Sequence, residues 1–184
     1  MDQQIVIDRT RHWIADMVIG LNLCPFARRV FEADTIRYVV SDAMDEKALL
    51  ADLSRELGVL VKLPIEKAET TLLIHPHVFG DFLDYNDFLD LAERQLDKLG
   101  LEGIIQIASF HPQYQFADTE LDAPENYTNR SPYPMLHLLR EESISRIAND
   151  PEELLEIPNR NIETLRALGK DKIVEKLRRI KDGL

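Results

Sequence analysis

The sequence contains a single cysteine and only seven glycines among its 184 residues. One cysteine can form neither an internal disulfide nor a thiolate-rich zinc site, and such a composition is typical of proteins in a reducing compartment. The glycines form neither the G-x-G-x-x-G pattern of dinucleotide-binding loops nor the G-x-x-x-x-G-K-[ST] pattern of P-loops. We therefore expect no nucleotide cofactor held by either kind of loop.

Long apolar runs and an excess of positive charge are also absent. No apolar stretch approaches the roughly 20 residues that a membrane-spanning helix requires, and the first residues lack the basic and apolar regions of a signal peptide. The chain carries 33 Asp and Glu against 22 Lys and Arg, a formal net charge of −11, which repels nucleic acid and anionic lipid. We expect a cytoplasmic protein whose partners include neither nucleic acid nor membranes.

The first two thirds of the chain alternate between strand and helix patterns. Short segments rich in β-branched and aromatic residues favour strands, and apolar residues three and four apart favour helices. The predicted strands cover 35–41, 70–74 and 103–110, and the predicted helices cover 8–20, 45–57 and 83–99. Between residues 35 and 110 the predicted order is therefore β-α-β-α-β.

The last third of the chain begins with a proline-rich polar stretch, 112–134, which we expect to be a functional loop without regular structure. A helix is predicted from Pro134 to Ile147, and a short one capped by Asp150 is predicted to stop before Pro158. Two more helices are expected over 161–168 and 170–181. The predicted fold is a single domain, 1–184, of the α+β or α/β class, with a three-stranded central sheet covered by helices and a C-terminal helical group.

Three of the five histidines stand beside prolines at the ends of predicted strands. His75 and His77 flank a proline after the second strand, and His111 precedes a proline after the third. Right-handed crossovers make consecutive strands parallel and bring their C-terminal ends to one edge, where ligands bind in such sheets. A mixed sheet with one reversed connection is the alternative. We expect the three histidines at this edge, beneath the 112–134 loop.

The H-x-H spacing of His75 and His77 also allows two imidazoles to share a divalent metal, with His111 or a loop acid completing the coordination shell. The alternative is that these rings bond to loop carbonyls at the strand ends. Because H-x-H alone is a weak metal signature, we expect no bound metal. If one binds, its candidate ligands are His75, His77 and His111.

Cys24 lies in the segment 21–29, directly after the first predicted helix, and an Arg-Arg pair begins four residues after it. A free cysteine is usually buried and inert, whereas a reactive thiolate would need these arginines to face the sulfur. The residue types also permit a nucleophilic Cys24 with His111 as base and Asn126 or Asn129 as the orienting group. The candidates for catalysis are Cys24, His111 and His137.

The segment 126–141 combines polar side chains, two arginines and a histidine around the predicted helix start. Backbone N–H groups at a helix N-terminus favour an anion, and Arg130 adds a bidentate donor. His137 and Arg140, three residues apart, would share a face of that helix. The alternative is a loop held by Asn and Ser capping bonds, with Arg130 paired to a loop acid. The candidate anion-binding residues are Arg130, Asn129, Ser131, Arg140 and Arg28.

Three segments, 21–29, 107–116 and 126–141, carry a resemblance to a known family. The Asn129-Arg130-Ser131-Pro132 motif and the His-Leu-Leu-Arg-Glu run that follows it are distinctive. With them the chain resembles the bacterial domain of unknown function family 1415, over nearly its whole length. The resemblance implies a bacterial, cytoplasmic, single-domain protein, and it implies no activity, cofactor or catalytic residue.

Two functions are consistent with these residues. The first is a binding protein or enzyme for an anionic small molecule, with a polar pocket at the strand ends under the 112–134 loop. In this hypothesis the arginines at 28 and 29 and those at 130 and 140 face one cleft. The second is a non-catalytic structural or interaction protein, in which the His, Arg and Asn side chains only fix loops.

Overall fold

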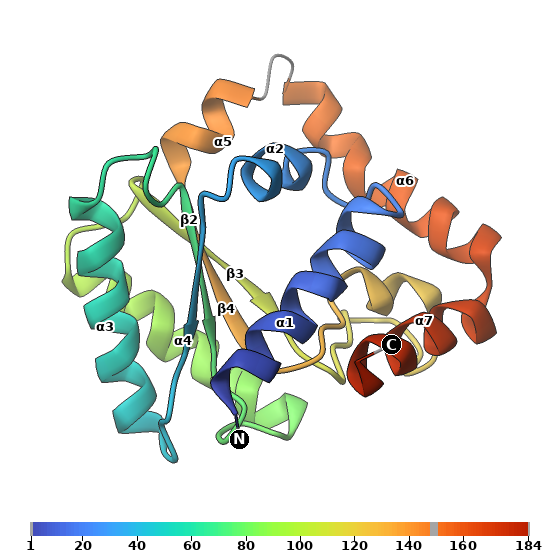
Figure 1. Ribbon diagram of the computed structural model, residues 1–184, viewed down its shortest axis with the longest axis horizontal. Helices are drawn as coiled ribbons and strands as arrows, with labels where there is room; N and C mark the ends of the chain where they lie inside the picture. Colours follow the sequence, from blue (N-terminus) through green and yellow to red (C-terminus); the bar gives the residue numbers. More distant parts are fainter. Residues whose placement is uncertain (1, 148–150, 184) are drawn as a thin grey trace.

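The computed structural model describes residues 2–147 and 151–183 and contains one four-stranded mixed sheet with helices on both faces (Figure 1). The strand order is β1 (Ile36–Val40), β2 (Thr70–Ile74), β4 (Met135–Arg140) and β3 (Ile105–Phe110). Strands β1 and β2 are parallel, and β4 is antiparallel to both β2 and β3. Hence β1, β2 and β3 run in the same direction, and their C-terminal ends reach one edge of the sheet.

The predicted elements of the first two thirds are all present, but the first helix begins at Gln3 instead of residue 8 and the second ends at Lys62 instead of residue 57. The helices are α1 (Gln3–Trp13), the π-helix η1 (Ile14–Ile19), α2 (Ala27–Glu32), α3 (Glu46–Lys62) and α4 (Phe82–Lys98). Asp45 and Asp81 cap α3 and α4 by accepting hydrogen bonds from backbone N–H groups of their first turns. The 112–134 loop, expected to lack regular structure, contains the 3-10 helix η2 (Pro124–Thr128).

The prediction of a helix from Pro134 to Ile147 is wrong in its first half, because Met135–Arg140 form the fourth strand β4, followed by α5 (Glu141–Ile147). This strand lies between two others and is covered on both faces. Leu136 and Leu138 pack toward α3 and α4, and Met135 packs toward α1. Unlike the strand at 70–74, this segment contains no β-branched residue, and Leu136 and Leu139 have the three-residue spacing of a helix.

The C-terminal segment forms two helices, α6 (Pro151–Leu168) and α7 (Lys170–Asp182). The prediction that a helix stops before Pro158 is wrong, because α6 continues through it. A proline removes one backbone donor, but contacts on its C-terminal side hold the helix. Asn161 Nδ2 donates to the Leu23 carbonyl over 2.8 Å, and Leu165 is fully buried. The expected cap, Asp150, lies outside the described residues.

The sheet separates two apolar cores. On the first face, α3 and α4 pack leucines and aromatics against Leu73, Leu136 and Leu138. On the second face, α1, η1 and the C-terminal helices pack against Leu72, Ile74 and Met135. In the described ranges no helix is both long and apolar enough to cross a membrane.

Candidate functional site: a cavity on the second face of the sheet

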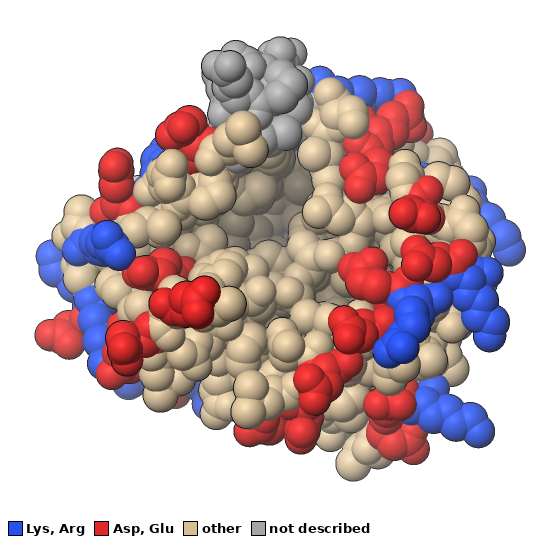
Figure 2. Space-filling model, turned by 180° about the vertical axis from the view of Figure 1, so that it is seen from behind, with Lys and Arg blue, Asp and Glu red and all other residues tan. Residues whose placement is uncertain are grey.

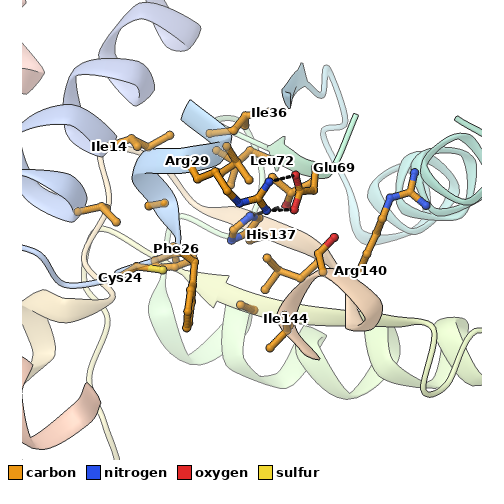
Figure 3. Close-up of a pocket in the computed structure, with 18 of the residues that line it drawn as sticks. Ile14, Cys24, Phe26, Arg29, Ile36, Glu69, Leu72, His137, Arg140 and Ile144 are labelled. Atoms are coloured by element: carbon orange, nitrogen blue, oxygen red, sulfur yellow. Dashed lines mark hydrogen bonds and ion pairs between the residues drawn. The ribbon is translucent and has the colours of Figure 1, made fainter. Parts of the chain in front are cut away.

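The second face of the sheet is not completely covered, and a cavity of about 310 Å³ lies between it and the helices η1, α2 and α5 (Figure 3). Seen from behind, the surface of the molecule has a hollow lined by uncharged residues in its upper part (Figure 2). Most of the apolar residues lining the cavity come from η1, α2, α5 and all four strands. They include Ile14, Val18, Val30, Ile36, Leu72, Ala108, Phe110, Leu139 and Ile144.

His137 and Thr70 place a polar group within this apolar lining. His137 lies on β4, where it pairs with Leu72 and Ala108 of the neighbouring strands, and Thr70 begins β2. The His137 Nε2 and Thr70 Oγ1 atoms are 2.6 Å apart, and Thr70 Oγ1 is 2.7 Å from the Leu138 carbonyl oxygen. The only proton of the hydroxyl satisfies the carbonyl, so Oγ1 accepts from Nε2–H. Because the ring proton is on Nε2, Nδ1 of His137 is unprotonated and keeps its lone pair.

The His137 imidazole is neutral at pH 7. Burial disfavours its charged form and lowers its pKa from 6.5 to about 4. The ring can therefore accept a hydrogen bond or a proton at Nδ1, but it supplies no positive charge to the cavity.

An ion pair between Arg29 and Glu69 lies at the mouth of the cavity. Both terminal nitrogens of Arg29 bond to the Glu69 carboxylate, one of them over 2.9 Å. The Glu69 side chain is buried and the Arg29 side chain is 52% exposed. The bond to Glu69 raises the pKa of Arg29. The two charges compensate each other, so the mouth carries no net charge.

Two further polar side chains reach the cavity wall, Cys24 and Ser143. Burial raises the pKa of the Cys24 thiol, so the sulfur is protonated at pH 7. The Ser143 hydroxyl is buried and has no hydrogen-bond partner within the described ranges. Cys24 and His137, two of the catalytic candidates from the sequence, thus line the same cavity.

The third candidate, His111, lies elsewhere, at the strand-end edge with His75. Both rings stack on Tyr85, with centroid separations of 5.2 Å for His111 and 5.6 Å for His75. His75 Nδ1 donates to the Val78 carbonyl over 3.2 Å, and His111 Nε2 donates to the Phe79 carbonyl over 3.1 Å. Burial lowers the pKa of both, that of His75 to about 4. Both rings therefore hold the turn after β2 as neutral groups.

His77 lies half-buried in that same turn. In the described part of the chain, no three His, Cys, Asp or Glu side chains are arranged to hold a metal ion. The expected candidate ligands His75, His77 and His111 therefore do not form such a cluster.

The Asn side chains expected near the site organise the 112–134 loop. Asn126 is fully buried, and its amide oxygen accepts from Phe116 N and Thr119 Oγ1. Its Nδ2 donates to two loop carbonyls. Asn129 Nδ2 donates to the Ser109 carbonyl over 3.1 Å, and Ser131 Oγ donates to the Tyr133 carbonyl over 2.7 Å. These bonds tie the loop to β3 and to itself.

The arginines at 28, 29, 130 and 140 do not face one cleft, because each donates in a different place. Arg28 is exposed and pairs with Glu32. Arg130 is 9% exposed and donates to the Tyr114 and Leu121 carbonyls. The Arg140 guanidinium points away from the cavity (Figure 3) and donates to three carbonyls near the end of α3. Of the four guanidinium groups, that of Arg29 lies at the cavity mouth.

Glu69, Thr70 and Ser143 were not recognised from the sequence. A single threonine at a strand start or a single acid before it carries no pattern. A strand assignment for 135–140 would have placed His137 and Arg140 on opposite faces of the sheet, because side chains alternate along a strand.

A family model described as a protein of unknown function, DUF1415, matches residues 5–175. No match was found among curated proteins or among solved structures. Because the family model matches most of the 184 residues, the chain belongs to the DUF1415 family.

Proposed function

We propose that this protein binds a small, largely apolar molecule in the cavity between the sheet and the helices η1, α2 and α5. The observation that carries the proposal is the cavity itself. Its volume of about 310 Å³ lies near the lower end of the roughly 300–1,000 Å³ range of ligand pockets. Its wall is apolar apart from a few polar groups, which is the composition of small-molecule sites.

The proposal keeps the small-molecule ligand expected from the sequence but places it on the sheet face instead of the strand-end edge. An anionic ligand is less well supported there, because Arg29 is already compensated by Glu69. The remaining arginines expected to bind it donate to Glu32 or to backbone carbonyls. His137 adds no charge, since burial lowers its pKa to about 4.

A structural or interaction role is the second candidate. It is favoured by the strand-end residues, since His75, His111 and Asn126 all bond to backbone groups of loops. These side chains fix loop conformations and leave few groups free for a ligand.

Titration of methyl-labelled protein with 2-methylnaphthalene tests the cavity directly by NMR. The methyl signals of Ile14, Leu72 and Ile144, which line the cavity, should shift first. Those of Leu53 and Leu60, buried between α3 and the sheet, should not. Shifts confined to the α3 side, or the absence of any shift, would contradict the proposal.

A cavity-filling variant supplies the matched comparison. Ala108 lines the cavity on β3, so Ala108→Leu should fill part of it and weaken binding at least tenfold while leaving the Tm unchanged or raised. Ala51→Leu, on the exposed surface of α3, adds the same atoms away from the cavity and should bind like the wild type. Equal binding by both variants would contradict the proposal.

A further inference from the structure

The proton positions around His137 limit which ligand group can face it. Thr70 Oγ1 has short contacts to two atoms, 2.6 Å to His137 Nε2 and 2.7 Å to the Leu138 carbonyl oxygen. If Nε2 carried no proton, the hydroxyl could satisfy only one of two acceptors, and the other would face an oxygen lone pair at hydrogen-bond distance. Both contacts are hydrogen bonds only when Nε2 is protonated. The position of Thr70 in the sheet thereby selects the His137 tautomer in which Nε2 is protonated and Nδ1 is not.

Nδ1 has no hydrogen-bond partner in the described ranges of the chain. In those ranges seven side-chain nitrogen and oxygen atoms are both fully buried and without a partner, and Nδ1 is not among them. Nδ1 is therefore accessible. The ring lines the cavity, so the accessible side of Nδ1 faces it. A bound molecule would meet a lone pair there, and only a hydrogen-bond donor satisfies a lone pair.

The charges around the cavity argue against an ionised ligand. Glu69 compensates Arg29 at the mouth, and the Arg140 guanidinium bonds to carbonyls near the end of α3 (Figure 3). The Cys24 thiol is protonated because burial raises its pKa. An ionised group within this apolar wall would lose its hydration without gaining a counter-charge, which is strongly unfavourable.

Ser143 supplies a second point of polar contact. Its side chain lines the cavity from α5, the residue is 8% exposed, and its hydroxyl has no partner in the described chain. A buried hydroxyl without a partner is costly, so a ligand that bonds to it gains more than one that does not.

We infer that the ligand of this cavity is an uncharged, mainly apolar molecule that carries a hydroxyl or N–H donor bonded to Nδ1 of His137. The inference rests on the proposed function and adds the chemical class of the ligand. Ser143 Oγ is positioned to bond to a second polar atom of the same molecule.

Three probes of similar shape test this assignment: 2-naphthol, which has a donor, 2-methylnaphthalene, which has none, and 2-naphthoate, which is an anion. The measured quantity is the ratio of the Kd of 2-methylnaphthalene to that of 2-naphthol. His137→Phe keeps the ring volume and removes the acceptor, so it should lower this ratio about threefold to tenfold. Naphthoate should bind most weakly to the wild type.

The outcomes separate the two proposals. If neither neutral probe binds the wild type, the proposed function is contradicted and the inference falls with it. If 2-methylnaphthalene binds but the ratio is the same in His137→Phe, only the inference is overturned. Tighter binding of naphthoate than of naphthol would also overturn it.

The tautomer can be measured without any variant or ligand. Nitrogen-15 NMR of the wild type should show His137 with a protonated Nε2 and an unprotonated Nδ1. Thr70→Val, which removes the hydroxyl that fixes the proton, should introduce a mixture of the two tautomers. A protonated Nδ1 in the wild type would overturn the inference even if apolar molecules bind.

Discussion

Arg29 of α2 and Glu69, the residue before β2, form a two-point ion pair in which the partners differ strongly in exposure. The Glu69 side chain is 6% exposed and that of Arg29 is 52% exposed. The carboxylate has lost most of its hydration, whereas the guanidinium remains half in water. This pair connects α2 to the sheet at the mouth of the cavity.

This difference in exposure predicts that replacing Arg29 destabilises the protein more than replacing Glu69 does. Arg29→Gln leaves a buried carboxylate without its cation and should lower the free energy of unfolding by about 1–3 kcal/mol. Glu69→Gln leaves a guanidinium that water can solvate and should cost less than about 1 kcal/mol. Urea unfolding at pH 7 measures both. Equal losses, or a larger loss in Glu69→Gln, would contradict this assignment of the burial cost.

Arg130 is predicted to stabilise the 112–134 loop. It donates to the Tyr114 and Leu121 carbonyls, and its guanidinium lies 4.3 Å from the ring centroid of Tyr127. Arg130→Ala should therefore lower the free energy of unfolding by about 2–4 kcal/mol. Arg28→Ala, which removes only an exposed pair with Glu32, is the matched control and should cost less than about 0.5 kcal/mol.

Thermal melts of the wild type and Arg130→Ala, with and without phosphate, distinguish this loop-stabilising role from the anion site expected from the sequence. That hypothesis requires phosphate to raise the Tm of the wild type and the rise to disappear in Arg130→Ala, with little loss of stability. Such a result would contradict the loop-stabilising role. The partners of Arg130 are carbonyls, and the loop acids Asp122 and Glu125 pair instead with Lys170 and Arg166.

The fold was predictable from the sequence wherever residue types and apolar spacing favour the same kind of element. The buried strand 70–74 contains the β-branched residues Thr70, Thr71 and Ile74 and has the predicted bounds. Strand β4 was not predictable, because Met135–Arg140 contain no β-branched residue and Leu136 and Leu139 have the three-residue spacing of a helix. This one error turned the His137–Arg140 spacing into a shared helix face, whereas in the strand the two side chains lie on opposite faces of the sheet.

The candidate site was predictable only in part for the same reason. Residue chemistry alone gave Cys24 and His137 as catalytic candidates, and both line the cavity. The strand-end histidines were expected at the correct edge, but His75 and His111 stack on the fully buried Tyr85 and bond to loop carbonyls. Which side chain fills a gap depends on packing between distant segments, and short-range patterns do not contain that information.

The stability of the protein should depend on pH through His75 and His137. Burial lowers the pKa of His75 and His137 from 6.5 to about 4. Between these pH values the unfolded chain binds more protons than the folded one, so the free energy of unfolding rises with pH. It should fall by about 1–3 kcal/mol per histidine as pH drops from 6.5 to 4.

Two variants separate the contribution of His137 from the loss of its hydrogen bond. His137→Phe removes one titrating ring and should reduce the pH slope without abolishing it, since the pKa values of His75 and His111 are lowered as well. Thr70→Val removes the bond to Nε2 but keeps the ring, so it should lower stability at every pH and preserve most of the slope. An unchanged slope in His137→Phe would contradict the prediction.

Cys24 should react slowly with alkylating reagents in the folded protein. Burial raises the pKa of its thiol, and the thiolate is the reactive form. At pH 7 we expect iodoacetamide to modify the folded chain at least about tenfold more slowly than the chain in urea. Mass spectrometry measures both rates, and 2-methylnaphthalene should slow the folded-state rate further because Cys24 lines the cavity. Faster modification of the folded chain would instead support the nucleophile hypothesis.

Gly20, at the end of the π-helix η1, is predicted to be required for the shape of the cavity wall. A Cβ atom at this position would collide with the Asp16 carbonyl oxygen and lie 3.1 Å from that of Ala15, both of them backbone atoms. Gly20→Ala should lower the free energy of unfolding by about 1–3 kcal/mol. Because Ile14 and Val18 of η1 line the cavity, the same variant should weaken binding of 2-methylnaphthalene.

Gly58 provides the matched control for this substitution. It lies inside α3, and a Cβ atom there meets no other atom within 4 Å. Gly58→Ala should raise the free energy of unfolding by about 0.5–1 kcal/mol, since alanine favours a helix over glycine, and should leave binding unchanged. Opposite signs of the two Gly→Ala changes would show that close backbone approach at Gly20, and not a general effect of the methyl group, sets the geometry of η1. If both variants were stabilised, the π-helix would have room to relax and the cavity wall would not depend on Gly20.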